Sequence, residues 1–277
     1  MGRNNPVYEI NPVRNAPMKC VQPSHYRAVF ISDVHLGFPG CSADYLLDFL
    51  RSTTCDYLYL VGDIIDIWQM KKRIYWPQQH NDVIRTILGK AKHGTRVIYV
   101  PGNHDELLRD FDGMKFGNLE IRERCIHTTR YDKQILIIHG DQFDGVIKCS
   151  KTLALIGSSA YELLLKANTL VNFIRRKLGL SYWSLARVLK HKVKQAVTYI
   201  SNFETALANE AKKLRVQGII AGHIHRAEIT MINDLVYCNC GDWVESCTAL
   251  VERVDGKLEL IHWTDQKASV KTFTLAA

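Results

Sequence analysis

Several short apolar runs in this chain stop at a cluster of polar residues, and this pattern constrains the fold more than any other feature. The first three runs, which end at SDVH, GD and PGNHD, are 28–31, 57–61 and 97–100. Helical patterns at 42–51, with Ser42 as N-cap, and at 78–92 lie between them. Strands that alternate with helices predict βαβ units and an α/β fold. Ligands of such sheets gather beyond the carboxyl ends of the strands, where these polar clusters lie.

The pattern changes after a fourth run, 134–138, which ends at HGD. Apolar residues at three- and four-residue spacing predict one helix over 153–174, and Ser181 begins a second that runs to about 214. Strand patterns then return, with the turn dipeptides ND and DG between them, at 218–221, 229–232, 235–238, 249–254 and 258–263. We therefore predict one domain, divided into an N-terminal arm (1–27), a core (28–147 and 215–277) and an inserted helical cap (148–214).

Composition and charge narrow the class of protein. The 277 residues are 47% hydrophobic and 23% charged, which is typical of a globular chain with a sizeable core. No apolar run approaches the roughly 20 residues of a membrane span, and the first 27 residues lack the apolar core of a signal peptide, so we expect a cytoplasmic protein. The net charge of +8 is concentrated between Gly145 and Gln195, which hold ten Lys or Arg and one acid. Such a segment indicates a local anionic partner or a well-solvated face.

Five polar clusters carry the chemistry, and each follows a predicted strand. They are Asp33-x-His35, Gly62-Asp63-x-x-Asp66, Gly102-Asn103-His104-Asp105, His139-Gly140-Asp141 and Gly222-His223-x-His225. Residues two apart on an extended chain point the same way, so both members of a D-x-H or H-x-H pair can converge on one point. Carboxylates together with imidazoles suit borderline divalent metals such as Mn, Fe, Co or Zn.

The set has enough ligands for two metal ions. Two ions about 3.5–4 Å apart need a bridging carboxylate, for which Asp63 is the natural candidate, and they acidify water into a hydroxide nucleophile. Asn103 offers a neutral oxygen, and the glycines allow close approach of the backbone. His104 alone would be interpreted as a turn residue, but within this set we predict a chemical role. Asp105 is predicted to cap a following helix or support the site, and Asp141 to brace a ligand.

These motifs, over residues 29 to about 240, resemble the calcineurin-like metallophosphoesterase superfamily. The resemblance implies a four-layer αββα sandwich with a dinuclear centre, in which Mn is the first expectation and Fe, Zn or Co are alternatives. It implies a first metal site of Asp33, His35, Asp63 and His225, and a second of Asp63, Asn103, His139 and His223. By the same resemblance His104 is catalytic and oriented by Asp66, and Asn103, His104 and His223 contact substrate.

The predicted cap combines an apolar stripe with basic residues and Tyr182-Trp183, which suits a lipid carrying phosphates or an anionic membrane. A helical hairpin with solvated Lys and Arg is the alternative. The layout is similar to UDP-2,3-diacylglucosamine hydrolases, which implies cleavage of that pyrophosphate to UMP and an acylated sugar 1-phosphate, peripherally at the inner membrane. The chain departs from their best-known branch at His104, where that branch carries Arg. Another phosphomonoester or phosphodiester, or nucleic acid, is the alternative substrate.

A nuclease would explain the sequence pI of about 9.0. It would be expected to pair basic residues with aromatic stacking platforms rather than with a Leu/Ile stripe, so we expect no nucleic-acid partner. A non-enzymatic scaffold should have lost metal ligands, and this sequence keeps all seven. The sequence gives no indication of oligomeric state.

Overall fold

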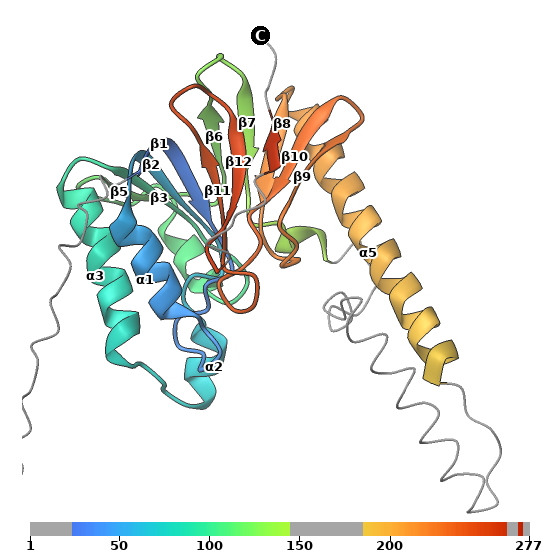
Figure 1. Ribbon diagram of the computed structural model, residues 1–277, viewed down its shortest axis with the longest axis horizontal. Helices are drawn as coiled ribbons and strands as arrows, with labels where there is room; N and C mark the ends of the chain where they lie inside the picture. Colours follow the sequence, from blue (N-terminus) through green and yellow to red (C-terminus); the bar gives the residue numbers. More distant parts are fainter. Residues whose placement is uncertain (1–23, 145–184, 265–270, 274–277) are drawn as a thin grey trace, which may run out of the picture.

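A computed structural model describes residues 24–144, 185–264 and 271–273 of the chain. Within these residues the strands form two sheets, shown in Figure 1. The first sheet has the order β13 (Lys271–Phe273), β12 (Leu258–His262), β11 (Thr248–Glu252), β1 (Ser24–Ile31), β2 (Thr53–Val61), β3 (Arg96–Val100), β5 (Leu119–Ile121) and β4 (Lys115–Phe116). The second has the order β6 (Cys125–Thr128), β7 (Gln134–Ile137), β8 (Gly218–Ala221), β10 (Leu235–Asn239) and β9 (Glu228–Ile232).

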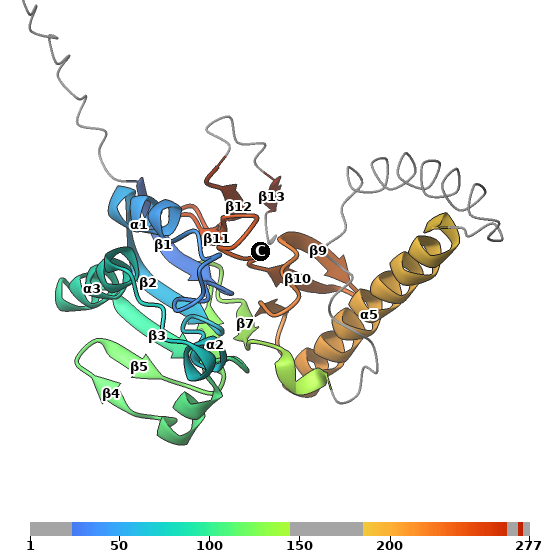
Figure 2. The same ribbon diagram turned by 90° about the horizontal axis from the view of Figure 1, so that it is seen from below.

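Helices cover the outer face of each sheet, as Figures 1 and 2 show. The helices are α1 (Ala43–Ser52), α2 (Ile67–Lys72), α3 (Gln78–Lys92) and α5 (Leu185–Lys213), with short 3-10 helices η1 (Glu106–Phe111) and η2 (Asp141–Phe143). Helices α1 and α3 lie against the first sheet, and the C-terminal half of α5 lies against the second. The two inner sheet faces pack on each other. This arrangement confirms the predicted αββα layers.

The alternation of side chains along β1 explains the layers. Val29 and Ile31 point towards α1 and α3, whereas Ala28 and Phe30 point into the space between the sheets. Because successive residues of a strand face opposite sides, a strand buried on both faces must be apolar throughout. Strands β1, β2, β3 and β5 are parallel, and so are β7, β8 and β10. The carboxyl ends within each set therefore lie at one edge of its sheet.

Most predicted elements are confirmed to within a few residues, and the differences have local causes. Strand β1 begins at Ser24, inside the predicted arm, because it pairs in parallel with β2 from Thr53 onwards. Ser42 does precede α1, but its side chain caps no helical N–H and donates instead to the carbonyl of Val244. The ND turn is confirmed by the positive φ of Asn233 and Asp234 between β9 and β10.

The predicted second helix of the cap corresponds to α5, which runs Leu185–Lys213. Its buried side chains Phe203, Leu207 and Ala211 pack on the second sheet beside Leu136 and Ile219, so this half of the helix forms an outer layer of the sandwich. The predicted helix over 153–174 and Tyr182-Trp183 lie outside the described residues, and the division into core and cap stays a prediction. None of the helices in the described part of the chain has the length and hydropathy needed to span a membrane.

Candidate metal centre

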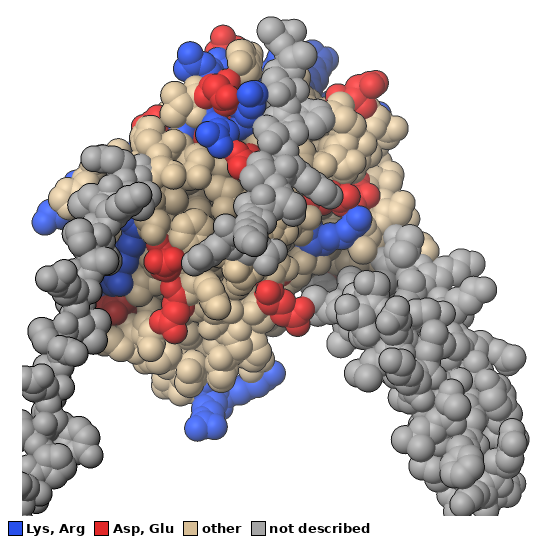
Figure 3. Space-filling view, in the orientation of Figure 1, with Lys and Arg blue, Asp and Glu red and all other residues tan. Residues whose placement is uncertain are grey.

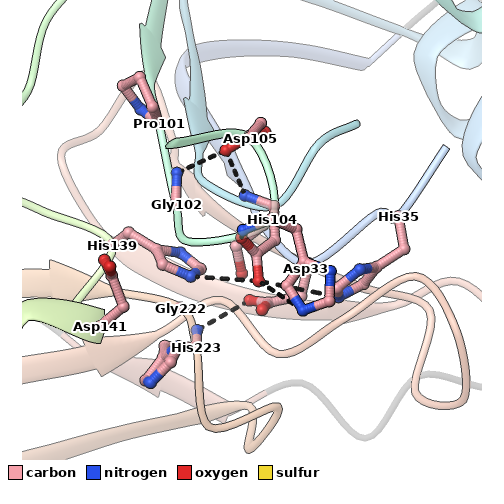
Figure 4. A network of polar contacts seen from close by, with 12 residues as sticks. Asp33, His35, Pro101, Gly102, His104, Asp105, His139, Asp141, Gly222 and His223 are labelled. Atoms are coloured by element: carbon pink, nitrogen blue, oxygen red, sulfur yellow. Dashed lines mark hydrogen bonds and ion pairs between the residues drawn. The ribbon is translucent and has the colours of Figure 1, made fainter. Parts of the chain in front are cut away.

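The predicted ligands meet where the carboxyl ends of strands from both sheets approach each other, as the close view in Figure 4 shows. Asp33 and Asp63 follow β1 and β2, His139 follows β7, and His223 and His225 follow β8. Two groups of three, whose ligand atoms lie within 4.8 Å of one another, could hold a metal ion: Asp33, His35 and His225; and Asp63, His139 and His223. Asp63 also groups with His35 and His104, which places it between the two sets, as a bridging carboxylate requires.

Four of these side chains carry buried polar atoms that lack a hydrogen-bond partner. Among the described residues, six buried side-chain atoms are unpartnered, and four belong to predicted ligands: Asp33 Oδ1, His35 Nε2, Asn103 Oδ1 and His139 Nε2. Two of the four do lie near an opposite charge, since Asp33 Oδ1 is 3.2 Å from His225 Nε2 and His139 Nε2 is 3.4 Å from Asp63 Oδ2. An unsatisfied buried polar atom costs about 1–3 kcal/mol, so the remaining atoms, on His35 and Asn103, need an explanation. Lone pairs of carboxylate, amide and imidazole groups that converge in this way fit divalent cations.

The backbone at the ligands adopts an uncommon conformation. Five of the seven predicted ligands have left-handed φ angles, 52° at Asp33, 56° at His35, 53° at Asp63, 71° at His223 and 53° at His225. Positive φ is uncommon for residues other than glycine, and it clusters at functional sites where the surrounding structure imposes it. The sharp turn after each strand is what directs these side chains into one volume.

Two glycines make room for this convergence. A Cβ at Gly102 would contact the carboxylate and backbone nitrogen of Asp63, and a Cβ at Gly222 would contact the carboxylate of Asp33. Gly102 lies in the loop after β3 and passes the loop after β2 of the same sheet, whereas Gly222 lies in the loop after β8 and passes the loop after β1 of the other sheet. Each glycine therefore lets a backbone segment pass close to a ligand carboxylate.

Hydrogen bonds to one ring nitrogen orient the imidazoles. His139 Nδ1 lies 2.9 Å from the carbonyl oxygen of Val61, and its Nε2 lies 3.4 Å from Asp63 Oδ2. His35 Nδ1 lies 3.1 Å from Asp66 Oδ2, and its Nε2 lies 4.0 Å from Asp63 Oδ2. Such contacts to the far nitrogen commonly fix the ring of a metal-binding histidine and leave the other nitrogen for the metal.

His104 is held on two sides beside the cluster. Its Nδ1 lies 2.9 Å from Asp66 Oδ1, which confirms the predicted contact between the two residues. The Trp68 ring packs on the imidazole at 4.5 Å between centroids, and its Nε1 donates to Glu106 over 3.4 Å. Burial lowers the pKa of His104, but the hydrogen bond of Asp66 and the charges of Asp63 and Asp66 outweigh it, so the net shift of the pKa is upward.

Asp105 organises two ligand loops and caps no helix. It precedes η1 but makes no side-chain cap; its carboxylate accepts from the backbone N–H of Gly102 and Ile64 and from the Tyr99 hydroxyl, at 2.6, 2.8 and 2.6 Å. It thus joins the loop after β3 to the loop after β2. Asp141 is paired with Arg109, whose terminal nitrogen lies 2.7 and 2.8 Å from the two carboxylate oxygens.

Opposite charges inside the cluster shift its pKa values in both directions. Burial alone would raise the pKa of Asp33, but the adjacent imidazole of His225 lowers it to about 2. Burial alone would lower the pKa of His139, but the Asp63 carboxylate raises it to about 10, and Asp33 likewise raises that of His225 to about 9. The protons on His139 and His225 neutralise buried carboxylate charge that a bound cation would also neutralise. Protons and metal ions therefore compete for these residues, and metal binding should weaken as the pH falls.

Two features near the cluster were not predicted from the sequence. Asp144 lies 2.8 Å from His223 Nε2 and accepts from the Tyr199 hydroxyl at 2.9 Å, so it connects a predicted ligand to α5. A cavity of about 280 Å³ opens beside the cluster and is lined by His35, Phe38, Asp66, Gln69, His104, His225, Val244 and Glu245. Asp144 is visible in the HGDQFD stretch, but no spacing rule singled it out.

Comparison with known proteins places this centre in a class of enzymes. The family model for calcineurin-like phosphoesterases matches residues 26–227, and the chain belongs to this family. It is therefore a metal-dependent hydrolase, and the His and Asp groups described above could hold its divalent metals.

More specific relatives share a single name, UDP-2,3-diacylglucosamine hydrolase. One, from Psychromonas ingrahamii, is 27% identical over 208 residues, which cover 72% of this chain and 81% of the relative. Another, from Haemophilus influenzae strain PittGG, is 25% identical over 236 residues, which cover 80% and 93%. Among solved structures, the Escherichia coli phosphoesterase YfcE has a TM-score of 0.45 and 14% identity, with 89% of this chain and 97% of YfcE covered.

Proposed function

We propose that the protein hydrolyses the pyrophosphate of UDP-2,3-diacylglucosamine, or of a related lipid-linked nucleotide, to UMP and an acylated sugar 1-phosphate. The shared name of relatives at 24–27% identity supports the substrate class. The observation that carries the chemistry is the presence of two groups of three, Asp33, His35 and His225, and Asp63, His139 and His223, whose ligand atoms lie within 4.8 Å of one another. The proposal includes a cytoplasmic location, at the surface of the membrane that holds the lipid.

The proposed metal ligands form two sets that share Asp63. Asp33, His35, Asp63 and His225 would hold one divalent ion, and Asp63, Asn103, His139 and His223 the other. Bound there, the ions would polarise the phosphoryl oxygens and acidify water, which are the two contributions that such ions make to phosphate-ester hydrolysis. Mn is the first expectation for the metal, and the oxygen and nitrogen ligands also suit Fe, Zn or Co.

His104 and Asp66 have the proposed proton-transfer role. A water oxygen forms a bond to phosphorus and that water gives up one proton to solvent, while the bond between phosphorus and the bridging oxygen breaks and the departing phosphate takes a proton from the His104 imidazole. Asp66 accepts from His104 Nδ1 and stabilises the protonated ring. His104 lines the cavity beside the cluster, where a substrate phosphate can reach it. Asn103 and His223 would contact the substrate phosphates as well, which is proposed from the family resemblance.

The first test is a comparison of substrates with the full chain. Purified protein and Mn²⁺ are incubated with UDP-2,3-diacylglucosamine, with the unacylated UDP-sugar and with a generic chromogenic phosphodiester, and UMP or chromophore release is measured. Rapid UMP release from the acylated substrate alone is expected. Activity on the generic ester alone would leave the metal centre supported and refute the lipid substrate.

The bridging role of Asp63 has a separate test. Asp63→Ala should lose both metals and activity together, because the carboxylate lies in both ligand sets, and metal content is measured by elemental analysis after dialysis. Asp56→Ala is the control, since that carboxylate pairs with His25 and belongs to neither ligand set, so the metal content should stay unchanged. Full activity in Asp63→Ala would contradict the bridging assignment.

A further inference from the structure

The connection between α2 and α3 exposes three cations followed by three large apolar side chains. We call residues Lys71, Lys72, Arg73, Ile74, Tyr75 and Trp76 the 71–76 surface; all six are exposed. Ile74 is 79% exposed, and Tyr75 and Trp76 are 38% and 36% exposed. No acidic residue lies between Asp66 and Asp82, so the local charge is +3. Soluble proteins rarely gather large apolar side chains on the surface in this way without a partner.

Packing inside the protein does not explain this surface. Helix α2 has no buried residue. Tyr75 and Trp76 each make a T-shaped contact with the buried His80 ring, at 5.6 Å between centroids, and His80 accepts a hydrogen bond from the backbone N–H of Gly37. The segment is therefore anchored at His80, beside the loop that carries His35, and presents its remaining apolar area outwards.

The surface lies next to the entrance of the candidate site. Asp66 and Gln69 line the cavity, and α2 leads from them to Lys71 and Lys72. At 1.5 Å per helical residue, the five residues from Asp66 to Lys71 span about 8 Å. Figure 1 shows α2 at the lower end of the molecule, and in Figure 3 Lys and Arg side chains project from that end.

We propose that the 71–76 surface binds the headgroup region of an anionic membrane and holds the cavity towards it. Aromatic rings and aliphatic side chains insert at the boundary between headgroups and acyl chains, and neighbouring Lys and Arg bind anionic lipid. The +3 charge beside Ile74, Tyr75 and Trp76 provides both interactions. The binding itself does not depend on the proposed function. Its use does rest on that function, because contact with the bilayer would let a lipid-linked substrate reach the cavity from the membrane surface.

The test is vesicle co-sedimentation of the full chain without substrate. Vesicles of phosphatidylcholine with 30% phosphatidylglycerol are compared with vesicles of phosphatidylcholine alone. The wild type should bind the anionic vesicles, and Lys71→Ser/Lys72→Ser should weaken binding by about 30-fold, from about fivefold for each lysine near an anionic surface. Ile74→Glu should weaken it at least as much, because it removes an inserted side chain and adds repulsion.

Matched controls separate this surface from general charge and hydrophobicity. Val254→Glu changes another exposed apolar residue, and Lys212→Ser/Lys213→Ser removes another exposed lysine pair; both should bind vesicles like the wild type. All variants should hydrolyse a soluble chromogenic phosphodiester at the wild-type rate, because none of the changed residues lines the cavity.

Three outcomes would overturn the proposal. The first is that the wild type does not bind anionic vesicles, and the second is that both 71–76 variants bind them as the wild type does. The third is that the wild type is a dimer that does not bind vesicles and Ile74→Glu is a monomer, which would assign the surface to a second copy of the chain. Failure of UMP release with intact vesicle binding would count against the proposed substrate and leave this surface supported.

Discussion

At the scale of single residues, Asp66 connects the candidate metal centre to the proposed acid. Its carboxylate contacts His35 Nδ1 and His104 Nδ1, and it also accepts from the backbone N–H of Gln69 at the start of α2. Burial would raise the pKa of Asp66, but the hydrogen bonds from His104 and His35 outweigh it and lower the pKa below the usual range. One ionised carboxylate therefore orients a proposed ligand and the proposed proton donor together.

This arrangement leads to a prediction for His104→Gln. Turnover should fall by about 10²- to 10⁴-fold, the usual contribution of a positioned acid, while metal content stays at the wild-type level. Steady-state kinetics and elemental analysis measure the two quantities. Esters with more acidic leaving groups should lose less, because their departure needs less protonation. An equal loss for all leaving groups would contradict proton donation to the leaving group and indicate that His104 stabilises charge on the phosphoryl oxygen. Unchanged turnover would return His104 to a role in the turn alone.

At the scale of elements, the sequence predicted the strands and helices that have strong apolar patterns. The predicted bounds of α3 and β8 agree with the structure, because both elements have clear buried positions and end at polar residues or turns. Strands β4, β5, β6 and β13 and helix α2 were missed. They have two to six residues, and α2 buries none of them, so no periodic pattern marks it.

The candidate site was predicted more completely than the pairing of the sheets. Each proposed ligand stands directly after a strand, so local sequence is enough to find it. The pairing of Ala28 with Glu252 joins residues more than 200 positions apart, and no local pattern carries that information. Asp144 was missed for a similar reason, since its contacts with His223 and Tyr199 depend on how α5 packs.

The packing of α5 can be tested with two buried residues of the same helix. Phe203 and Leu207 are both fully buried, but only the Phe203 ring lies beside a proposed ligand, at 5.9 Å from the His223 ring. Phe203→Ala and Leu207→Ala should each lower the free energy of unfolding, by about 3–5 and 2–5 kcal/mol. Only Phe203→Ala should also weaken metal binding, as measured by titration calorimetry. Equal metal affinity in both variants would mean that α5 does not position His223.

At the scale of the whole molecule, a buried polar network joins the two sheets. Glu252 of β11 is fully buried and lies 2.7 Å from both Arg27 of β1 and His127 of β6. His127 Nδ1 also lies 3.0 Å from the Tyr59 hydroxyl. Burial would raise the pKa of Glu252, but the hydrogen bond from His127, with contributions from Arg130 and Arg27, outweighs it and lowers the pKa.

Because the pKa of Glu252 is lowered in the folded state, the contribution of its ionised carboxylate to stability depends on pH. It is fully present above the ordinary glutamate pKa of 4.5 and is lost as the pH falls through the lower value in the folded state. Glu252→Gln should cost about 3–5 kcal/mol of unfolding free energy at pH 7, the usual effect of breaking a buried pair. Urea unfolding at pH 7 and pH 3.5 measures it. The difference from the wild type should shrink at the lower pH, and a constant difference would contradict the linkage.

The origin of the proposed ligands has a consequence for how the molecule holds together. Asp33, His35 and Asp63 follow strands of the first sheet, whereas His139, His223 and His225 follow strands of the second. Ions held between them would cross-link the two halves of the sandwich, and at a concentration 100 times its dissociation constant each ion would add about 2.7 kcal/mol to the stability. Chelators would therefore weaken the packing of the two sheets on each other as well as stop turnover. The metal content of a preparation would then indicate whether the two halves of the sandwich have assembled.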